Sequence, residues 1–155
     1  MLTSLKEIIN EFETLCLAHD EIKTFEYGDF LDIIKSNQIE YTAAMLNCSQ
    51  FTPDPENKTI SYVFDLLVMD KTFKDNSNVV DVENQTALIL SDLAMVINYS
   101  DRWQSLGIYN TPAPAFKYRE KGADVVTGWG LSFIFNAIVE TGLCDLPITG
   151  YDYEN

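Results

Sequence analysis

A strand, a polar loop and a long helix in the middle of the chain constrain the fold more than any other segment. Residues 62–70 read Tyr-Val-Phe-Asp-Leu-Leu-Val-Met-Asp, which indicates a central strand packed on both of its faces. Residues 79–97 repeat apolar side chains at helical spacing, and Asn78 before them is a suitable N-cap. Because such a strand and such a helix can bury each other, this block predicts the nucleus of an α+β domain.

The segments on either side predict one further helix and three further strands. Ser4 and Glu7 have the spacing of a capping box, so a first helix is predicted from there to about residue 20. Strands are predicted at residues 40–49, 115–120 and 126–140, and the last of them is strongly apolar.

Three segments are less regular. Residues 25–34 are ambiguous: residues 27–29 indicate a turn, and residues 30–34 fit either a short strand or a helical turn. Two prolines within residues 52–58 predict a long hairpin tip, and residues 100–114 predict an irregular connection. Together the elements predict an antiparallel four-stranded sheet made of two hairpins, packed on one face by the N-terminal helix and the central helix.

Length and apolar content fit a single globular domain. The chain has 155 residues, of which 46% are hydrophobic, and this is enough for a substantial core. We expect residues 1–147 to form one α+β domain and residues 148–155 to form an acidic C-terminal arm. No apolar run approaches the roughly 20 residues of a membrane span, so no membrane contact is expected.

The charge is unusually negative. Asp and Glu number 24 against 10 Lys and Arg, which gives a net charge of −14. DNA-binding proteins generally carry the opposite sign, because neutralising phosphates supplies much of their affinity. Two interpretations remain open at this point. The acidity can simply favour solubility, or it can serve a surface that lies near DNA without binding it.

Catalytic and metal-binding patterns are scarce. His19 is the one histidine, near the end of the first predicted helix, where it would face the helix C-terminus or solvent. Cys16, Cys48 and Cys144 are odd in number and have no metal-binding spacing, so they argue against a disulfide framework and against zinc. We therefore expect no enzymatic activity and no cofactor.

The loop that joins the predicted strand at residues 62–70 to the helix at residues 79–97 holds several side chains with oxygen atoms that could bind a metal ion. Its spacing lacks the glycine and the glutamate that an EF-hand loop requires, so the favoured interpretation is a solvated loop that caps the following helix. The candidate ligands are Asp70, Asp75, Asn76, Asn78 and Asp81.

Two features of the predicted strands need an explanation. Asp65 interrupts an apolar strand, and it should either pair with Lys117 or Arg119 on a neighbouring strand or line an exposed sheet face. We favour the exposed face, as part of an interface or a channel wall. The Gly-Trp-Gly motif at residues 128–130 indicates a bulge or tight entry into the last strand, with packing favoured over ligand stacking.

With these elements placed, the chain resembles the tail-terminator and head–tail connector proteins of tailed bacteriophages. The likeness is greatest to those of phages that infect Bacteroidales, crAss-like phages among them. It extends over about residues 3–147. Its carriers are residues 5–9, 25–29, 62–70 and 74–78, the pair Ser91-Asp92, the pair Gly128-Trp129 and residues 144–147.

The resemblance implies a non-enzymatic ring protein of the virion, made in the host cytoplasm. The ring would be a homo-oligomer of six or twelve copies at the neck or tail end, joined to portal, neck or tail proteins around the DNA channel. A closed ring repeats one contact between two different surfaces of each subunit. A strongly negative bore would let DNA pass without being held through its phosphates.

A second function class uses the same charge. An acidic DNA mimic that occupies a nucleic-acid-binding enzyme would be a soluble monomer or dimer rather than a ring. The size of the particle in solution separates the two.

Long polar segments are the expected contacts between ring subunits and with the proteins above and below. They are residues 51–59, 70–78 and 149–155, and they carry aromatic side chains that need a partner to cover them. The candidate interface residues are Phe51, Asp65, Phe73, Asp75, Asn76, Tyr151 and Tyr153.

Overall fold

The fold is α+β, as the sequence predicts. A computed structural model describes residues 4–36, 38–110, 113–121 and 124–139. The elements are α1 (Leu5–Leu17), β1 (Thr24–Tyr27), α2 (Phe30–Lys35), β2 (Ala43–Asp54), β3 (Thr59–Thr72), α3 (Val79–Tyr99), α4 (Asp101–Ser105), β4 (Ile108–Asn110), β5 (Phe116–Lys121) and β6 (Val125–Ile138).

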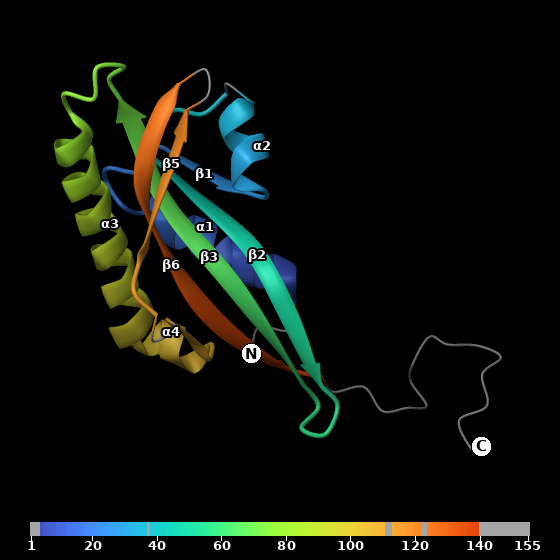
Figure 1. Ribbon diagram of the computed structural model, residues 1–155. Helices are drawn as coiled ribbons and strands as arrows, with labels where there is room; N and C mark the ends of the chain where they lie inside the picture. Colours follow the sequence, from blue (N-terminus) through green and yellow to red (C-terminus); the bar gives the residue numbers. More distant parts are fainter. Residues whose placement is uncertain (1–3, 37, 111–112, 122–123, 140–155) are drawn as a thin grey trace.

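Three long antiparallel strands, β2, β3 and β6, form the centre of one mixed sheet (Figure 1). The sheet order is β1-β2-β3-β6-β4, and β5 also pairs with β6. Ile108 of β4 lies opposite Phe135, and Phe116 of β5 lies opposite Gly130, so β4 and β5 follow each other along the same edge of β6. Six described strands therefore occupy five positions.

The expected four-stranded antiparallel sheet is thus incomplete. It lacks β4 and β1, and β1 runs parallel to β2. Both strands are too short, at 3 and 4 residues, to show a period of two in the sequence. The two predicted hairpins, β2–β3 and β5–β6, are present.

One face of the sheet is covered by α1, α3 and α4, and the main core lies between these layers. Phe12 of α1 is at its centre. Its ring lies 5.7 Å from that of Phe64, 5.8 Å from that of Phe133 and 5.0 Å from that of Trp103, measured between centroids. Tilted and edge-on contacts of this kind are the favoured aromatic geometry.

The other face carries a smaller core under α2, so the expectation of helices on one face alone is wrong. Ile34 of α2 packs in a cluster that includes Met45, Leu67, Met69 and Val126. The two-sided apolarity of β3 explains this layer, because Leu67 and Met69 need a cover just as Phe64 does. Past this cluster the same face carries polar residues of β3 and β6 together with Val63 and Ile134.

The first helix begins where its capping signal predicts. Ser4 Oγ accepts from the Glu7 backbone N–H at 3.2 Å, and the Ser4 N–H donates to the Glu7 carboxylate at 3.0 Å, which completes the predicted capping box. The central helix begins at Val79 as predicted and continues to Tyr99. Two short helices, α2 and α4, replace the segments that the sequence leaves ambiguous or irregular.

The predicted loop at residues 52–58 begins too early, because β2 continues through Pro53 to Asp54. β1 pairs only with Ala43–Leu46, so the rest of β2 is an edge strand and Pro53 interrupts no ladder on its outer side. The hairpin tip is therefore short. Asp54 caps it by accepting from the backbone N–H of Asn57 at 3.1 Å.

Candidate interface surfaces

Phe51 lies in β2 near the hairpin end rather than in a loop. Its side chain is on the α1 face of the sheet and its ring centroid is 6.4 Å from that of Tyr62. The residue is nonetheless 64% exposed, because no described helix covers this end. A half-covered aromatic of this kind is available to a partner.

Asp65 is half-buried and lies on the same face of the sheet as Leu67 and Met69, the face that carries α2. It stands between Asn47 of β2 and Ser132 of β6, and Ser132 Oγ donates to its carboxylate at 2.5 Å. The proposed cationic partners are engaged elsewhere, since Lys117 pairs with Glu83 and Arg119 with Asn76. Ser61 and Asn136, 2.5 Å apart, form a second polar pair nearer the hairpin end, with Val63 and Ile134 between the two pairs. We call Asp65, Ser132, Ser61 and Asn136 the polar strip.

The β3–α3 loop brings Phe73, Asp75 and Asn76 together at the opposite end of the sheet. Phe73 is 63% exposed. Asp75 accepts from the backbone N–H of Ser77 at 3.0 Å, and this hydrogen bond lowers the pKa of the carboxyl. Asn76 adopts a left-handed backbone, with φ of 62°, and accepts a hydrogen bond from Arg119 of β5. The loop is therefore fastened to the β5 edge.

The candidate metal ligands have separate structural tasks. Asp70 accepts from Thr42 Oγ1 at 2.8 Å, and Asn78 accepts from the Phe73 N–H at 2.7 Å. Asn78 precedes α3 but makes no side-chain cap bond to that helix. Across the parts of the chain that the structure describes, no three His, Cys, Asp or Glu side chains gather as a metal site.

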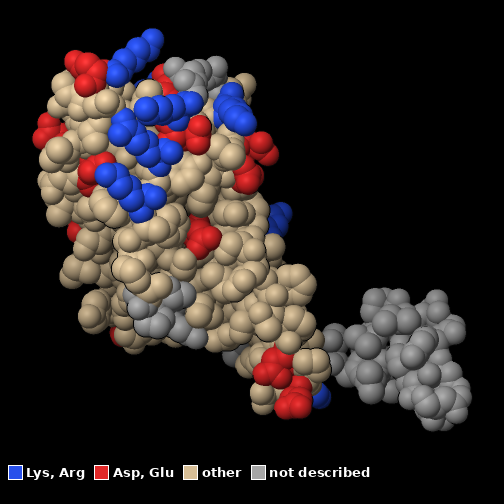
Figure 2. All heavy atoms as spheres, in the orientation of Figure 1, with Lys and Arg blue, Asp and Glu red and all other residues tan. Residues whose placement is uncertain are grey.

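A group of cations at the same end was not anticipated from the sequence. Figure 2 shows Lys and Arg side chains gathered at the end of the molecule where β5 and the β3–α3 loop lie. We call Lys74, Lys117, Arg119 and Lys121 the basic patch; all four are exposed. The alternation Lys-Tyr-Arg-Glu-Lys over residues 117–121 of a predicted strand was the signal that could have identified it.

The hairpin at the far end of the sheet is acidic. Asp54 and Glu56 lie at its tip, with Lys58 as their one basic neighbour (Figure 2). Thr59 pairs with Ile138 at this end and Thr72 pairs with Val125 at the other. Lys117 is level with Val68 of β3 and Lys121 with Thr72. At about 3.3 Å per residue, these cations lie roughly 30 to 43 Å from the Thr59 end of the strand.

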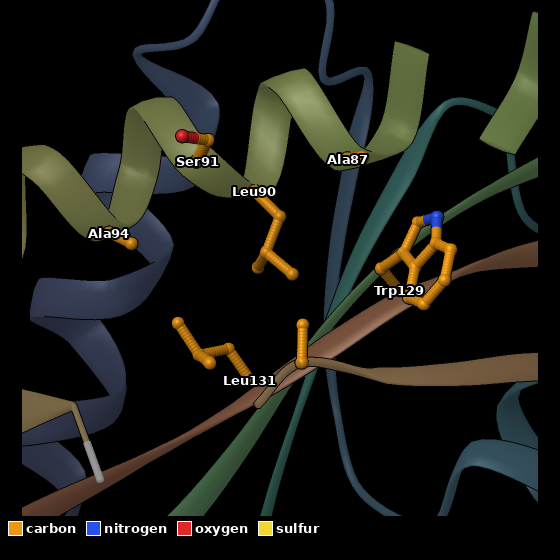
Figure 3. Close-up of a pocket in the computed structure, with 7 residues that line it drawn as sticks. Ala87, Leu90, Ser91, Ala94, Trp129 and Leu131 are labelled. Carbon is orange, nitrogen blue, oxygen red and sulfur yellow. The ribbon is translucent and has the colours of Figure 1, made fainter. Parts of the chain in front are cut away.

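An apolar groove of about 370 Å³ lies between α3 and β6 (Figure 3). Trp129 forms one wall, and its indole N–H donates to the Glu83 carbonyl at 3.0 Å. The ammonium of Lys117 is 5.9 Å from the centroid of the same ring and pairs with the Glu83 carboxylate at 2.5 Å. Trp129 thus packs as expected, held by α3 and β5. The other lining residues are Ala87, Leu90, Ser91, Ala94, Ala115 and Leu131.

A second groove follows the line between α1 and α3. An ion pair between Arg102 and Glu11 at 2.6 Å lies at one end, and His19 approaches Asp92 at 3.4 Å at the other. The histidine thus bridges the two helices. The described residues that line this end of the groove with His19 include no Ser, Thr or Cys.

The described thiols are poor nucleophiles. Burial raises the pKa of Cys16 to about 12, and Cys48 also has a raised pKa, from partial burial and then from the nearby Asp65 carboxylate. A thiol with a raised pKa is little ionised near neutral pH. Cys144 lies outside the described residues, as do Tyr151 and Tyr153.

The sequence matches no protein-family model and no curated protein. Within the described ranges, no helix is both long enough and apolar enough to cross a membrane.

Proposed function

We propose that this chain is a non-enzymatic structural protein of a tailed-phage virion, with a tail-terminator-like fold. It would form a ring of six or twelve copies at the neck or tail end, between portal-proximal and tail components and around the DNA path. Two kinds of support exist, the family resemblance of the sequence and the unlike ends of the sheet.

The observation that carries the proposal is the separation of charge along one rigid sheet. The acidic hairpin tip and the basic patch lie at opposite ends of β2, β3 and β6. Two surfaces that differ within one subunit and attract each other between subunits are what a head-to-tail contact requires. Such a contact closes into a ring when its rotation allows.

Exposed aromatic residues mark the same two ends. Phe51 lies near the hairpin and Phe73 lies beside the basic patch. Aromatic side chains are enriched where interfaces bury them. We assign both to subunit contacts, and Asp65 with its polar strip to the wall that faces the DNA path.

The proposal is tested by the mass of the purified chain in solution and by its presence in purified virions. Sedimentation should show one large species of six or twelve copies at moderate salt. It should dissociate in 1 M salt, because exposed charge pairs are screened within about 3 Å there. A chain that stays monomeric or dimeric and is absent from virions would contradict the proposal.

The alternative is an acidic DNA mimic that binds a nucleic-acid-binding enzyme. The net charge of −14 suits this function equally. The basic patch disfavours it, because four exposed cations interrupt the surface at one end. Competition with DNA for such an enzyme, by a monomer or dimer, would be the positive result for this alternative.

A further inference from the structure

We propose that the open edge of β5 accepts residues 151–154 of a neighbouring copy as an added strand. The inference deepens the proposed ring and rests on it for the neighbouring copy. It states which segment pairs with which strand edge. This pairing can be wrong even if the chain does form a ring.

The edge of β5 offers an unfilled place in the sheet. β5 pairs with β6 on one side, and no described strand pairs with it on the other. The outward backbone N–H and C=O groups of an edge strand form a template for a further strand. Extended segments bind such edges through main-chain hydrogen bonds, while alternate side chains determine which segment is accepted.

The side chains of β5 select for acidic segments. Lys117, Arg119 and Lys121 alternate along one face of the strand. Glu83 already neutralises Lys117 at 2.5 Å, which leaves Arg119 and Lys121. Arg119 donates to Asn76, but its guanidinium has five N–H groups, and Lys121 has no ion-pair partner in the described parts of the chain. Two cations two residues apart therefore remain for an incoming strand.

Residues 151–154 have the complementary pattern. They read Tyr-Asp-Tyr-Glu, so in a strand Asp152 and Glu154 would share one face and the two tyrosines the other. Asp152 and Glu154 have the same spacing as Arg119 and Lys121. The tyrosines would then lie on the face of Tyr118. Residues 140–155 hold four acidic residues and no Lys or Arg, so the whole segment is attracted to a basic edge.

Chain length favours a neighbour over the same subunit. The backbone N–H of Val139 donates to the Lys58 carbonyl at 2.7 Å, beside the hairpin tip. The start of β5 lies level with Gly130, nine residues back along β6 or roughly 30 Å away. To reach its own β5, the chain after β6 would first have to reverse direction, which takes about four residues. About seven of residues 140–150 then remain, and they span only about 23 Å, which is less than the distance to be covered. The same segment of an adjacent subunit does not have to run back along its own β6 to reach this β5.

Charge exchange between two full-length variants tests the pairing. The edge variant carries Arg119→Glu with Lys121→Glu, and the segment variant carries Asp152→Lys with Glu154→Lys. Each alone should raise the protein concentration for half-assembly by about tenfold or more, because every pair then opposes like charges. An equal mixture should assemble as the unmodified chain does, since each edge again meets a segment of opposite charge.

A matched control separates this contact from net charge. Lys6→Glu with Lys35→Glu alters exposed residues on α1 and α2 by the same amount as the edge variant. This control should assemble normally. If it is impaired as strongly as the edge variant, or if the mixture is not rescued, the inference is wrong.

Zero-length cross-linking identifies the donor of the strand. Unlabelled and ¹⁵N-labelled chains are refolded together, and a carbodiimide is used to join lysine to carboxylate. Links from Lys121 to Asp152 or Glu154 that combine both isotopes support the inference. Links within one isotope alone show a chain folding back on itself and overturn it. If the chain assembles but gives no such link, the strand addition is wrong and the proposed ring is unaffected. If the chain stays monomeric, both proposals are wrong.

Discussion

Cys16 places an ionisable group at the centre of the main core. Its thiol is fully buried on the core-facing side of α1, and burial raises its pKa from 9.0 to about 12. In the unfolded chain the thiol ionises above pH 9, while in the folded chain it stays neutral until about pH 12. Its contribution to stability is therefore fully present below pH 9 and is lost as the pH rises from 9 to 12.

Replacing this residue should weaken the alkaline loss of stability. Between pH 9 and pH 10 the free energy of unfolding of Cys16→Ala should fall by about 1 kcal/mol less than that of the unmodified chain. Urea unfolding of both chains at the two pH values measures the difference. An identical fall in the two chains would show that the thiol is already accessible when folded.

Two glycines in β6 have different reasons to lack a side chain. A Cβ on Gly128 would collide with the backbone carbonyl of Val68, while a Cβ on Gly130 would meet the ring of Phe116. A backbone cannot retreat as an edge side chain can. The glycine pattern predicted a bulge or a tight entry into the strand, but both glycines lie within β6 in unbroken register with β3. Which neighbour comes close to each glycine depends on the register with β3 and on β5.

We therefore expect Gly128→Ala to be the more damaging of the two substitutions. It should cost about 3 kcal/mol of unfolding free energy or prevent folding, and Gly130→Ala should cost about 1 kcal/mol. Chemical denaturation of both variants gives the comparison. Equal losses would contradict the register of β3 with β6.

At the scale of elements, the spacing of apolar residues predicted the helices and strands correctly where these elements are long. β3, β6, α1 and α3 were predicted within a few residues because each repeats its apolar side chains several times. The strands β1 and β4 are held by neighbours rather than by their own pattern. Pro53 led to the wrong prediction of a loop at residues 52–54. A proline can lie in β2 there because no strand pairs with that part of β2 on its outer side, and the sequence does not show this.

The buried stripe of α3 can be tested by two substitutions on opposite sides of that helix. Leu93 is 2% exposed and faces the sheet, whereas Leu88 is 60% exposed. Leu93→Asp should destabilise by more than about 4 kcal/mol, because it buries a charge without a partner. Leu88→Asp should change stability by less than about 0.5 kcal/mol. Thermal unfolding of the two variants decides, and similar melting temperatures would mean that the helix is rotated.

At the scale of the whole molecule, the sequence identified the exposed aromatics but not the surface that joins them to a partner. Phe51 and Phe73 were recognisable as anchors in polar segments. The basic patch combines Lys74, from the β3–α3 loop, with three cations of β5. These are about 45 residues apart in the chain, so only the folded sheet brings them to one end.

The segment after Leu146 should matter for assembly and not for folding. Its residues follow β6 in the sequence, and the described residues of the two cores all come from segments before it. A chain ending at Leu146 should have a free energy of unfolding within about 0.5 kcal/mol of that of the full chain, but it should no longer assemble. Matched denaturation and sedimentation runs test both parts. Unimpaired assembly by the shortened chain would remove this segment from the interface.

The proposed function depends most on closure into a ring. Negative-stain electron microscopy of the purified full chain at moderate salt tests this directly, because class averages show rotational symmetry without a reference. We expect closed particles with a central opening and six or twelve equivalent subunits. Monomers, two-fold dimers or open filaments as the only particles would contradict it.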